Sequence, residues 1–333
     1  MKPWEIATFC MRQYPGTNTA LTNLARNTGS THHTLSGASP WGPEVTFFLE
    51  ELRERQPRVV LFGAWSDHYH RFLGFLQDLG MPAGIYWTSS SGQMDIVGEI
   101  ERLSRVIDDP RVRYRMFANE RLAKALGRHL DDVHFVPDTV IWPDQAATSN
   151  HRPNTCFAIS LFCPIVQNNR KNILNCLLAL AQLDDDYILY LNGLTENPHY
   201  KTLLDTLAIR YQDFGWMSRD AYEETLGRVD LGLQVSFAET FDHVAADHIV
   251  RSIPVITSRM VPVMDAMSTS VRSCFVVDNP EDYREIGSKI RWAMANRAAC
   301  QQLAGDMRNQ LGKENGRRVA LATKVLNEIS SNA

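Results

Sequence analysis

The chain has 333 residues, of which 44% are hydrophobic and 22% are charged. This length and balance allow two globular domains of about 150 residues each and argue against a disordered chain. The formal net charge of −4 gives no overall positive field, which excludes binding to nucleic acid or an anionic membrane through net charge alone.

Short apolar runs alternate with longer amphipathic segments in the first half, a pattern typical of βα units and a parallel sheet. Strands are expected at residues 4–10, 58–64, 83–88, 114–118 and 133–137. Between them, residues 46–55 and 98–107 have the 3.6-residue period of amphipathic helices. The first half is therefore predicted to be one parallel α/β domain.

A polar segment with Pro143 and Pro153 follows and predicts a linker. Beyond it the alternation resumes. Strands are expected at residues 156–162, 187–193, 211–216, 231–237, 253–258 and 274–278. We expect domains of residues 1–145 and 146–311, followed by a helix of residues 312–333 that packs back on the first domain. In such sheets ligands bind at the carboxyl ends of the strands, with a cleft between the domains as the expected site.

Residues 235–258, VSFAETFDHVAADHIVRSIPVITS, place several ionisable side chains directly after a buried strand. Glu239 to His243 fall in the turn between this strand and the next helix. Unpaired backbone N–H groups and the helix dipole favour an anion there, and phosphate fits. The carboxylates of Glu239 and Asp247 lie on either side and would accept hydrogen bonds from hydroxyls. The pattern suits a nucleoside diphosphate sugar, although both carboxylates could simply stabilise the helix start.

The stretch from Glu239 to Asp247, followed by IPVITS, resembles the E-x7-E motif of retaining glycosyltransferases with the GT-B fold, the large group called family 4. This chain differs from the common pattern in having Asp at the second acidic position and in reading ETFDHV where many members read EGFGLPV. In VQNNRKNIL, Lys171 matches the family lysine that contacts the donor diphosphate. Arg170 stands in for the family arginine, which many members carry several residues earlier. DFGWMSRD resembles the loop that holds the nucleobase.

The resemblance implies an α/β fold of two Rossmann-like parallel-sheet domains that face each other across a cleft, the first for the acceptor and the second for the nucleotide sugar. It implies transfer of the sugar to an acceptor hydroxyl with retention of configuration and with neither metal nor cofactor. Glu239 would hold sugar hydroxyls, and Lys171 would stabilise the leaving diphosphate.

The other residues implied by the resemblance bind substrate. The diphosphate would contact three elements: a glycine loop after the first strand, Arg170, and the turn after the strand predicted at 231–237. The loop of Trp216 would flank the base, and Asp247 would hold the ribose. A serine after the strand at 83–88 would replace a histidine that many members have. These binding residues are Gly16, Thr17, Ser90, Arg170, Trp216, Met217, Thr240, Phe241, Asp242, His243, Val244 and Asp247.

The donor and acceptor stay open at this stage. A UDP-sugar is favoured by its prevalence among such enzymes, and a GDP-sugar comes next. The acceptor is a glycan, a small molecule or, as a minority view based on the basic tract at residues 111–129, modified DNA. Two alternatives remain: a sugar-nucleotide epimerase or hydrolase of the same fold, using Asp67, His68 or His70, and a noncatalytic nucleotide-sugar-binding subunit.

The six cysteines are scattered, mostly inside apolar runs, without a C-x-x-C pair or a metal-ligand spacing. They are expected to be reduced core residues. The first residues lack the basic region and apolar run of a secretion signal, and no apolar stretch approaches the length that spans a bilayer. We therefore expect a soluble cytoplasmic protein with no membrane span and no metal site.

Overall fold

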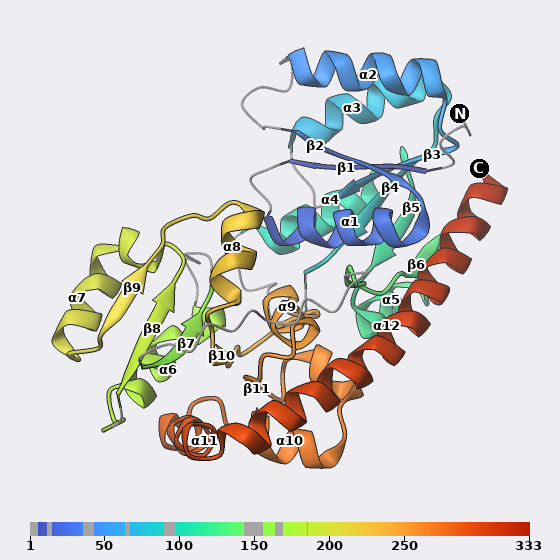
Figure 1. Ribbon diagram of the computed structural model, residues 1–333. Coiled ribbons are helices and arrows are strands. Elements are labelled where there is room, and N and C mark those ends of the chain that lie inside the picture. The colour runs from blue at the N-terminus through green and yellow to red at the C-terminus, as the bar shows by residue number, and fades with distance from the viewer. Residues whose placement is uncertain are drawn as a thin grey trace. The chain divides into compact units, whose positions relative to one another are not determined.

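A computed structural model describes residues 6–11, 15–35, 43–63, 67–89, 98–142, 156–163, 169–184 and 186–333 (Figure 1). Its contacts divide the chain into two compact units. One consists of Met1–Ile141 with Asn315–Ala333, and the other of Trp142–Glu314. Each unit contains a six-stranded parallel sheet.

The sheet of the first unit has the strand order β2-β1-β3-β4-β5-β6. Its strands are β1 (Ile6–Met11), β2 (Thr31–Leu35), β3 (Val59–Gly63), β4 (Ala83–Trp87), β5 (Val112–Phe117) and β6 (Val133–Phe135). Five of these strands, all except β2, were predicted from the sequence, and the structure confirms them. Strand β2 was not predicted, because its sequence THHTL contains no apolar run. It lies at the edge of the sheet, where side chains can stay half-buried.

Both faces of this sheet are covered, so alternate residues of β1 enter different cores. Ala7 and Phe9 belong to one hydrophobic cluster, whereas Ile6 and Cys10 belong to the other. The helices of this unit before α12 are α1 (Pro15–Thr28), α2 (Pro43–Arg55), α3 (Asp67–Asp78), α4 (Glu99–Asp108) and α5 (Glu120–Leu126).

The sheet of the second unit has the order β12-β11-β10-β7-β8-β9, which places β10 and β7 side by side at its centre. Its strands are β7 (Phe157–Leu161), β8 (Tyr187–Leu191), β9 (Tyr211–Asp213), β10 (Leu231–Gln234), β11 (Val255–Ser258) and β12 (Val276–Val277). The α-helices before α12 are α6 (Ile173–Leu180), α7 (Pro198–Thr206), α8 (Arg219–Leu226), α9 (His243–Val250), α10 (Thr269–Phe275) and α11 (Tyr283–Ala295). The strand predicted at 274–278 was too long, since its first two residues end α10.

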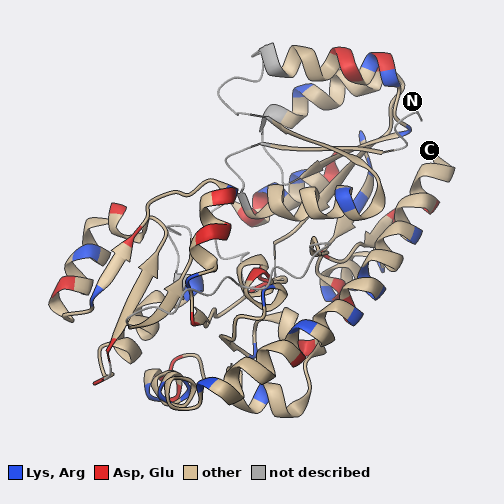
Figure 2. Cartoon of the chain, in the orientation of Figure 1, with Lys and Arg blue, Asp and Glu red and all other residues tan. Residues whose placement is uncertain are grey.

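The last helix, α12 (Arg297–Asn332), ends in the first unit. Ala322, Leu326 and Ile329 join the hydrophobic cluster that contains Cys10. At its carboxyl end, Arg58 and Arg113 donate hydrogen bonds to the carbonyl groups of Ser330 and Asn332, which have no partner within the helix. Figure 2 shows basic and acidic residues mixed along α12. Among the described residues, no helix is both long and apolar enough to cross a membrane.

A buried histidine joins α9 to the central strands of the second sheet. The ring of His248 lies against Gly232 of β10, where an added Cβ would come 2.6 Å from His248 Cδ2. His248 Nδ1 lies 2.7 Å from the Val244 carbonyl oxygen, and Nε2 lies 2.7 Å from Ser160 Oγ. A carbonyl only accepts, so Nδ1 carries the proton and Nε2 accepts from the serine. Burial lowers the pKa of His248 to about 4.

This pKa predicts a loss of stability in mild acid. The unfolded chain takes up a proton near pH 6.5 and the folded chain only near pH 4, so the contribution of His248 is complete above pH 6.5 and is lost as the pH falls toward 4. The full effect is about 3 kcal/mol of unfolding free energy. We expect urea unfolding at pH 4.5 and 7 to show a smaller pH dependence for His248→Asn than for the wild type. His129→Asn, at an exposed site, is the control. Equal pH dependence in all three proteins would contradict the assignment.

Candidate functional site

Two loops at the carboxyl edge of the second sheet meet beside β10. Arg170 and Lys171 lie in a short 3-10 turn (Asn169–Lys171) before α6. Glu239 lies in the turn between β10 and α9. The loops are joined through the backbone, because the Phe237 N–H donates to the Arg170 carbonyl oxygen at 2.8 Å. Residues about 70 positions apart in the sequence are thus brought together, as expected for neighbouring strands of a parallel sheet.

The Glu239 carboxylate is shared between two cations. Its Oε2 lies 2.6 Å from Arg170 Nη1, and its Oε1 lies 2.6 Å from Lys171 Nζ. Lys171 Nζ is also 3.5 Å from Asp242 Oδ2. Glu239 and Lys171 are each 8% exposed at the side chain, and the Asp242 side chain is fully buried. The four side chains form one buried, formally neutral group, which we call the edge cluster: Arg170, Lys171, Glu239 and Asp242.

The two carboxyl groups of the edge cluster differ in how readily they ionise. Burial alone would raise the pKa of Glu239, but the charges of Lys171 and Arg170 outweigh it and hold that pKa below its ordinary value. Burial and the negative charge of Glu239 raise the pKa of Asp242, and together they outweigh the opposing charges of Lys171 and Arg170. Burial would lower the pKa of Lys171, but Asp242 and Glu239 outweigh it and raise the pKa. Lys171 is therefore protonated and positively charged at neutral pH.

Unusual backbone conformations shape both loops. Asp242 has φ +73° and caps α9, its Oδ1 accepting from the Ala245 N–H at 2.9 Å. Asn172, with φ +53°, donates from Nδ2 to the Pro280 carbonyl oxygen at 2.6 Å. Non-glycine residues seldom adopt this region, and they cluster at functional sites. Lys171 is therefore followed directly by a hydrogen-bonded residue of unusual backbone conformation, and Glu239 is followed by another three residues later.

The remaining residues predicted around α9 differ in exposure. Phe241 is buried, and its ring lies 5.3 Å from that of His243, centroid to centroid. Thr240, His243 and Val244 are half-buried. Like Glu239 and Asp242, they belong to the turn after β10 or to the first turn of α9, as the sequence pattern predicts.

The predicted nucleobase loop joins β9 to α8. Trp216 is 63% exposed, whereas Met217 packs against a hydrophobic cluster that includes Phe162. The loop is anchored by Asp213, a residue that sequence reasoning missed. Its carboxylate accepts from the N–H groups of Gly193 (2.6 Å), Thr195 (2.8 Å) and Gly215 (2.9 Å) and from the Thr195 hydroxyl (2.7 Å).

Burial would raise the pKa of Asp213, but these hydrogen bonds outweigh it and lower the pKa. Gly193 and Gly215 have φ +95° and +65°, so a glycine two residues after Asp213 was the available signal. The Asp213 carboxylate therefore connects the loops that follow β8 and β9.

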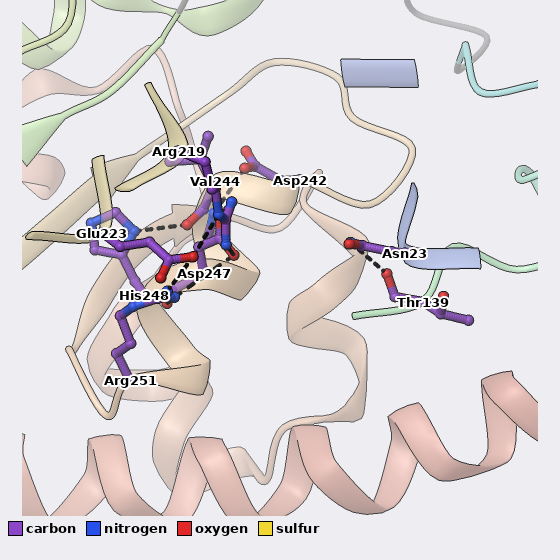
Figure 3. A network of polar contacts seen from close by, with 10 residues as sticks. Asn23, Thr139, Arg219, Glu223, Asp242, Val244, Asp247, His248 and Arg251 are labelled. Atoms are coloured by element: carbon purple, nitrogen blue, oxygen red, sulfur yellow. Dashed lines mark hydrogen bonds and ion pairs between the residues drawn. The ribbon is translucent and has the colours of Figure 1, made fainter. Parts of the chain in front are cut away.

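Asp247, predicted to hold a ribose, lies on α9 and is paired with an arginine (Figure 3). Its Oδ2 accepts from Arg219 Nη1 at 2.9 Å and its Oδ1 from Nη2 at 3.1 Å. Arg251 Nη1 donates to the Asp247 carbonyl oxygen at 3.1 Å. Glu223 Oε1 accepts from Arg219 Nε at 2.6 Å and lies 3.1 Å from Arg251 Nη2. This network was not predicted from the sequence, because its members come from two separate helical segments.

In the first unit, Gly16 and Thr17 lie in the first turn of α1, and the Thr17 hydroxyl is 2.9 Å from that of Thr88. An added Cβ at Gly16 would meet nothing within 4 Å, so crowding does not demand glycine there. Ser90 lies outside the described residues, as do the side chains of Asp67 and His68. Arg111 Nη2 lies 2.7 Å from the exposed His70 Nδ1. Within the described residues, no three His, Cys, Asp or Glu side chains form a group that could hold a metal ion.

No family model matches this sequence, and no curated protein does. Solved structures do match. The HepE protein of Anabaena in complex with UDP and glucose is 12% identical, with a TM-score of 0.70 and coverage of 98% of this chain and 99% of that one. Sucrose-phosphate synthase from Thermosynechococcus elongatus is 12% identical (TM-score 0.67; 99% and 100% covered). A glycosyltransferase from Rickettsia africae is 13% identical (TM-score 0.64; 100% of both covered). Together with the two six-stranded parallel sheets, these likenesses confirm the predicted fold, α/β with two Rossmann-like units of the GT-B type.

Proposed function

We propose that this protein is a glycosyltransferase that moves a sugar from a nucleoside diphosphate sugar to an acceptor hydroxyl. The edge cluster is the observation that carries the proposal. Two cations lie at the carboxyl edge of a parallel sheet, next to the start of a helix, where anionic ligands of such sheets bind. The solved structure of HepE contains UDP and glucose, which favours a UDP-sugar as the donor of this protein. A GDP-sugar is the second candidate. The second unit binds the donor, and the first unit binds the acceptor.

In this proposal the donor diphosphate replaces Glu239 as the partner of Lys171 and Arg170. Charge grows on the leaving phosphate oxygen as the glycosidic bond breaks, and fixed cations stabilise that charge most in the transition state. The backbone amides of residues 240–244 contribute to the same task. Released from its two cations, the Glu239 carboxylate is available for hydrogen bonds from sugar hydroxyls.

The proposed transfer retains the anomeric configuration and uses neither a metal ion nor a protein nucleophile. The leaving phosphate and the incoming hydroxyl lie on the same face of the sugar, and the phosphate takes the acceptor's proton. An epimerase or hydrolase would instead need a positioned acid or base. His70 is a poor candidate for that role, because it is 68% exposed and its Nδ1 lies 2.7 Å from Arg111 Nη2.

The first test is a thermal-unfolding screen with UDP, GDP, ADP and their sugars. A ligand that binds only the folded state at 100 times its Kd adds about 2.7 kcal/mol of stability, which raises Tm by roughly 5 °C for a chain of this size. We expect UDP and UDP-sugars to give the largest rise and inorganic pyrophosphate a smaller one. If none of the nucleotides shifts Tm, the donor assignment is wrong.

Substituting a cation of the edge cluster and substituting its Glu239 carboxylate should have different effects on turnover and on UDP binding. Lys171→Ala removes a cation that meets growing charge, so turnover should fall about 100-fold, more than donor binding weakens. Glu239→Gln removes a competitor for both cations, so free UDP should bind as tightly as to the wild type or more tightly, while transfer falls at least about tenfold. Calorimetry with UDP and steady-state kinetics with the donor measure both effects.

The control is Lys201→Ala, which breaks an exposed ion pair with Asp205 in the same unit and should change neither quantity. Because removing Lys171 leaves buried carboxylates with less compensation, each variant's unfolding curve is recorded, and Lys171→Arg, which keeps the charge, is included. Unchanged turnover in folded Lys171→Ala would remove the lysine from the mechanism. A loss of UDP affinity in Glu239→Gln would exclude the proposed exchange of partners.

A further inference from the structure

The pairing of Asp247 with Arg219 is more elaborate than a surface ion pair. The guanidinium group binds both carboxylate oxygens, at 2.9 and 3.1 Å, in the fork geometry that arginine favours. Asp247 is 14% exposed at the side chain, although Arg219 is 50% exposed. Exposed ion pairs usually contribute little to stability, because their side chains are mobile. Here, however, other residues also contact the arginine.

Two further contacts hold Arg219. Its Nε donates to Glu223 Oε1 one turn later in α8, and its guanidinium carbon lies 5.5 Å from the centroid of the Tyr222 ring. The Tyr222 hydroxyl is buried and has no hydrogen-bond partner within the described part of the chain. Arg251 adds a second cation to the carboxylates of Glu223 and Asp247, at 3.1 and 3.8 Å. These contacts hold the guanidinium group of Arg219 beside the Asp247 carboxylate (Figure 3).

The position of Arg219 in the chain relates it to the predicted nucleobase loop. It is the first residue of α8, directly after the capping residue Ser218 and two residues after Met217. One ion pair consequently ties the loop of Trp216 and Met217 to the carboxylate at position 247. A base and its ribose are adjacent in a nucleotide, so a fixed distance between these two elements suits their joint recognition.

We propose that Arg219 is a positioning residue for ribose recognition, acting through Asp247. Each Asp247 oxygen uses one lone pair for the arginine and keeps another for a ribose hydroxyl. Held on both oxygens, the carboxylate cannot rotate away, so it distinguishes a ribose from a 2′-deoxyribose. The inference rests on the proposed function, since it assumes that a nucleotide binds at this edge of the sheet.

The test compares UDP with 2′-deoxy-UDP by calorimetry, and GDP and ADP with their 2′-deoxy forms. We expect the wild type to bind the ribonucleotide at least about tenfold more tightly, the worth of one charge-assisted hydrogen bond. Arg219→Ala should reduce this preference to about twofold. Arg219→Lys, which has no fork, should restore it only in part. Asp247→Asn should abolish the preference, and Arg219→Ala should add no further loss to it.

Arg228→Ala is the control, because it removes another exposed arginine–glutamate ion pair of the same unit, the one with Glu224. It should keep the full preference. The proposal is overturned if Arg219→Ala keeps the preference, or if it weakens both forms of the nucleotide equally, which would make the pair a clamp between α8 and α9 only. A wild type that binds no nucleotide at all would overturn the proposed function itself.

Discussion

The proposed chemistry depends on one interaction, the sharing of the Glu239 carboxylate between Arg170 and Lys171. Two buried cations at a sheet edge would be costly if they were unpaired, and two buried carboxylates equally so. Together they are formally neutral, which allows the fold to keep strong charges at a buried position. The same pairing makes the cations exchangeable, since the two negative charges of a diphosphate can pair with both cations while sugar hydroxyls donate hydrogen bonds to the Glu239 carboxylate.

Residues around the edge cluster hold its charged side chains in place through hydrogen bonds. Asp242 adopts a left-handed backbone conformation, caps α9 and places a second carboxyl group beside Lys171. Asn172 holds the other loop from a similar conformation. His248 seats α9 against β10, so the helix start is fixed relative to the strand that precedes it. Local hydrogen bonds thus hold Asn172 and Asp242, which flank the charged side chains, as a site that must orient a charged ligand requires.

Much of the fold could be predicted from the sequence. Central strands such as β3 and β10 are buried on both faces, so their residues are almost all apolar and stand out from the helices around them. Edge strand β2 was missed because its THHTL sequence carries no such signal, its polar side chains being bonded to neighbours such as Thr8 and Asn18. The position of Lys171 and Glu239 at one sheet edge follows from parallel topology, and the structure brings these two side chains into contact. Arg219 could not be predicted as a partner of Asp247, because the contact depends on how α8 is oriented in space. For Asp213 the sequence offered a weak signal, the glycine two residues later, but not the loop after β8 that its carboxylate also binds.

The most direct measurement is a crystal structure of the protein with UDP. If the account is right, the diphosphate lies within hydrogen-bonding distance of Lys171 Nζ and of the backbone amides at the start of α9, and the distance from Lys171 Nζ to Glu239 Oε1 increases from its present 2.6 Å. A structure in which UDP binds elsewhere, or in which it binds here while both cations stay on Glu239, would contradict the proposed exchange of partners.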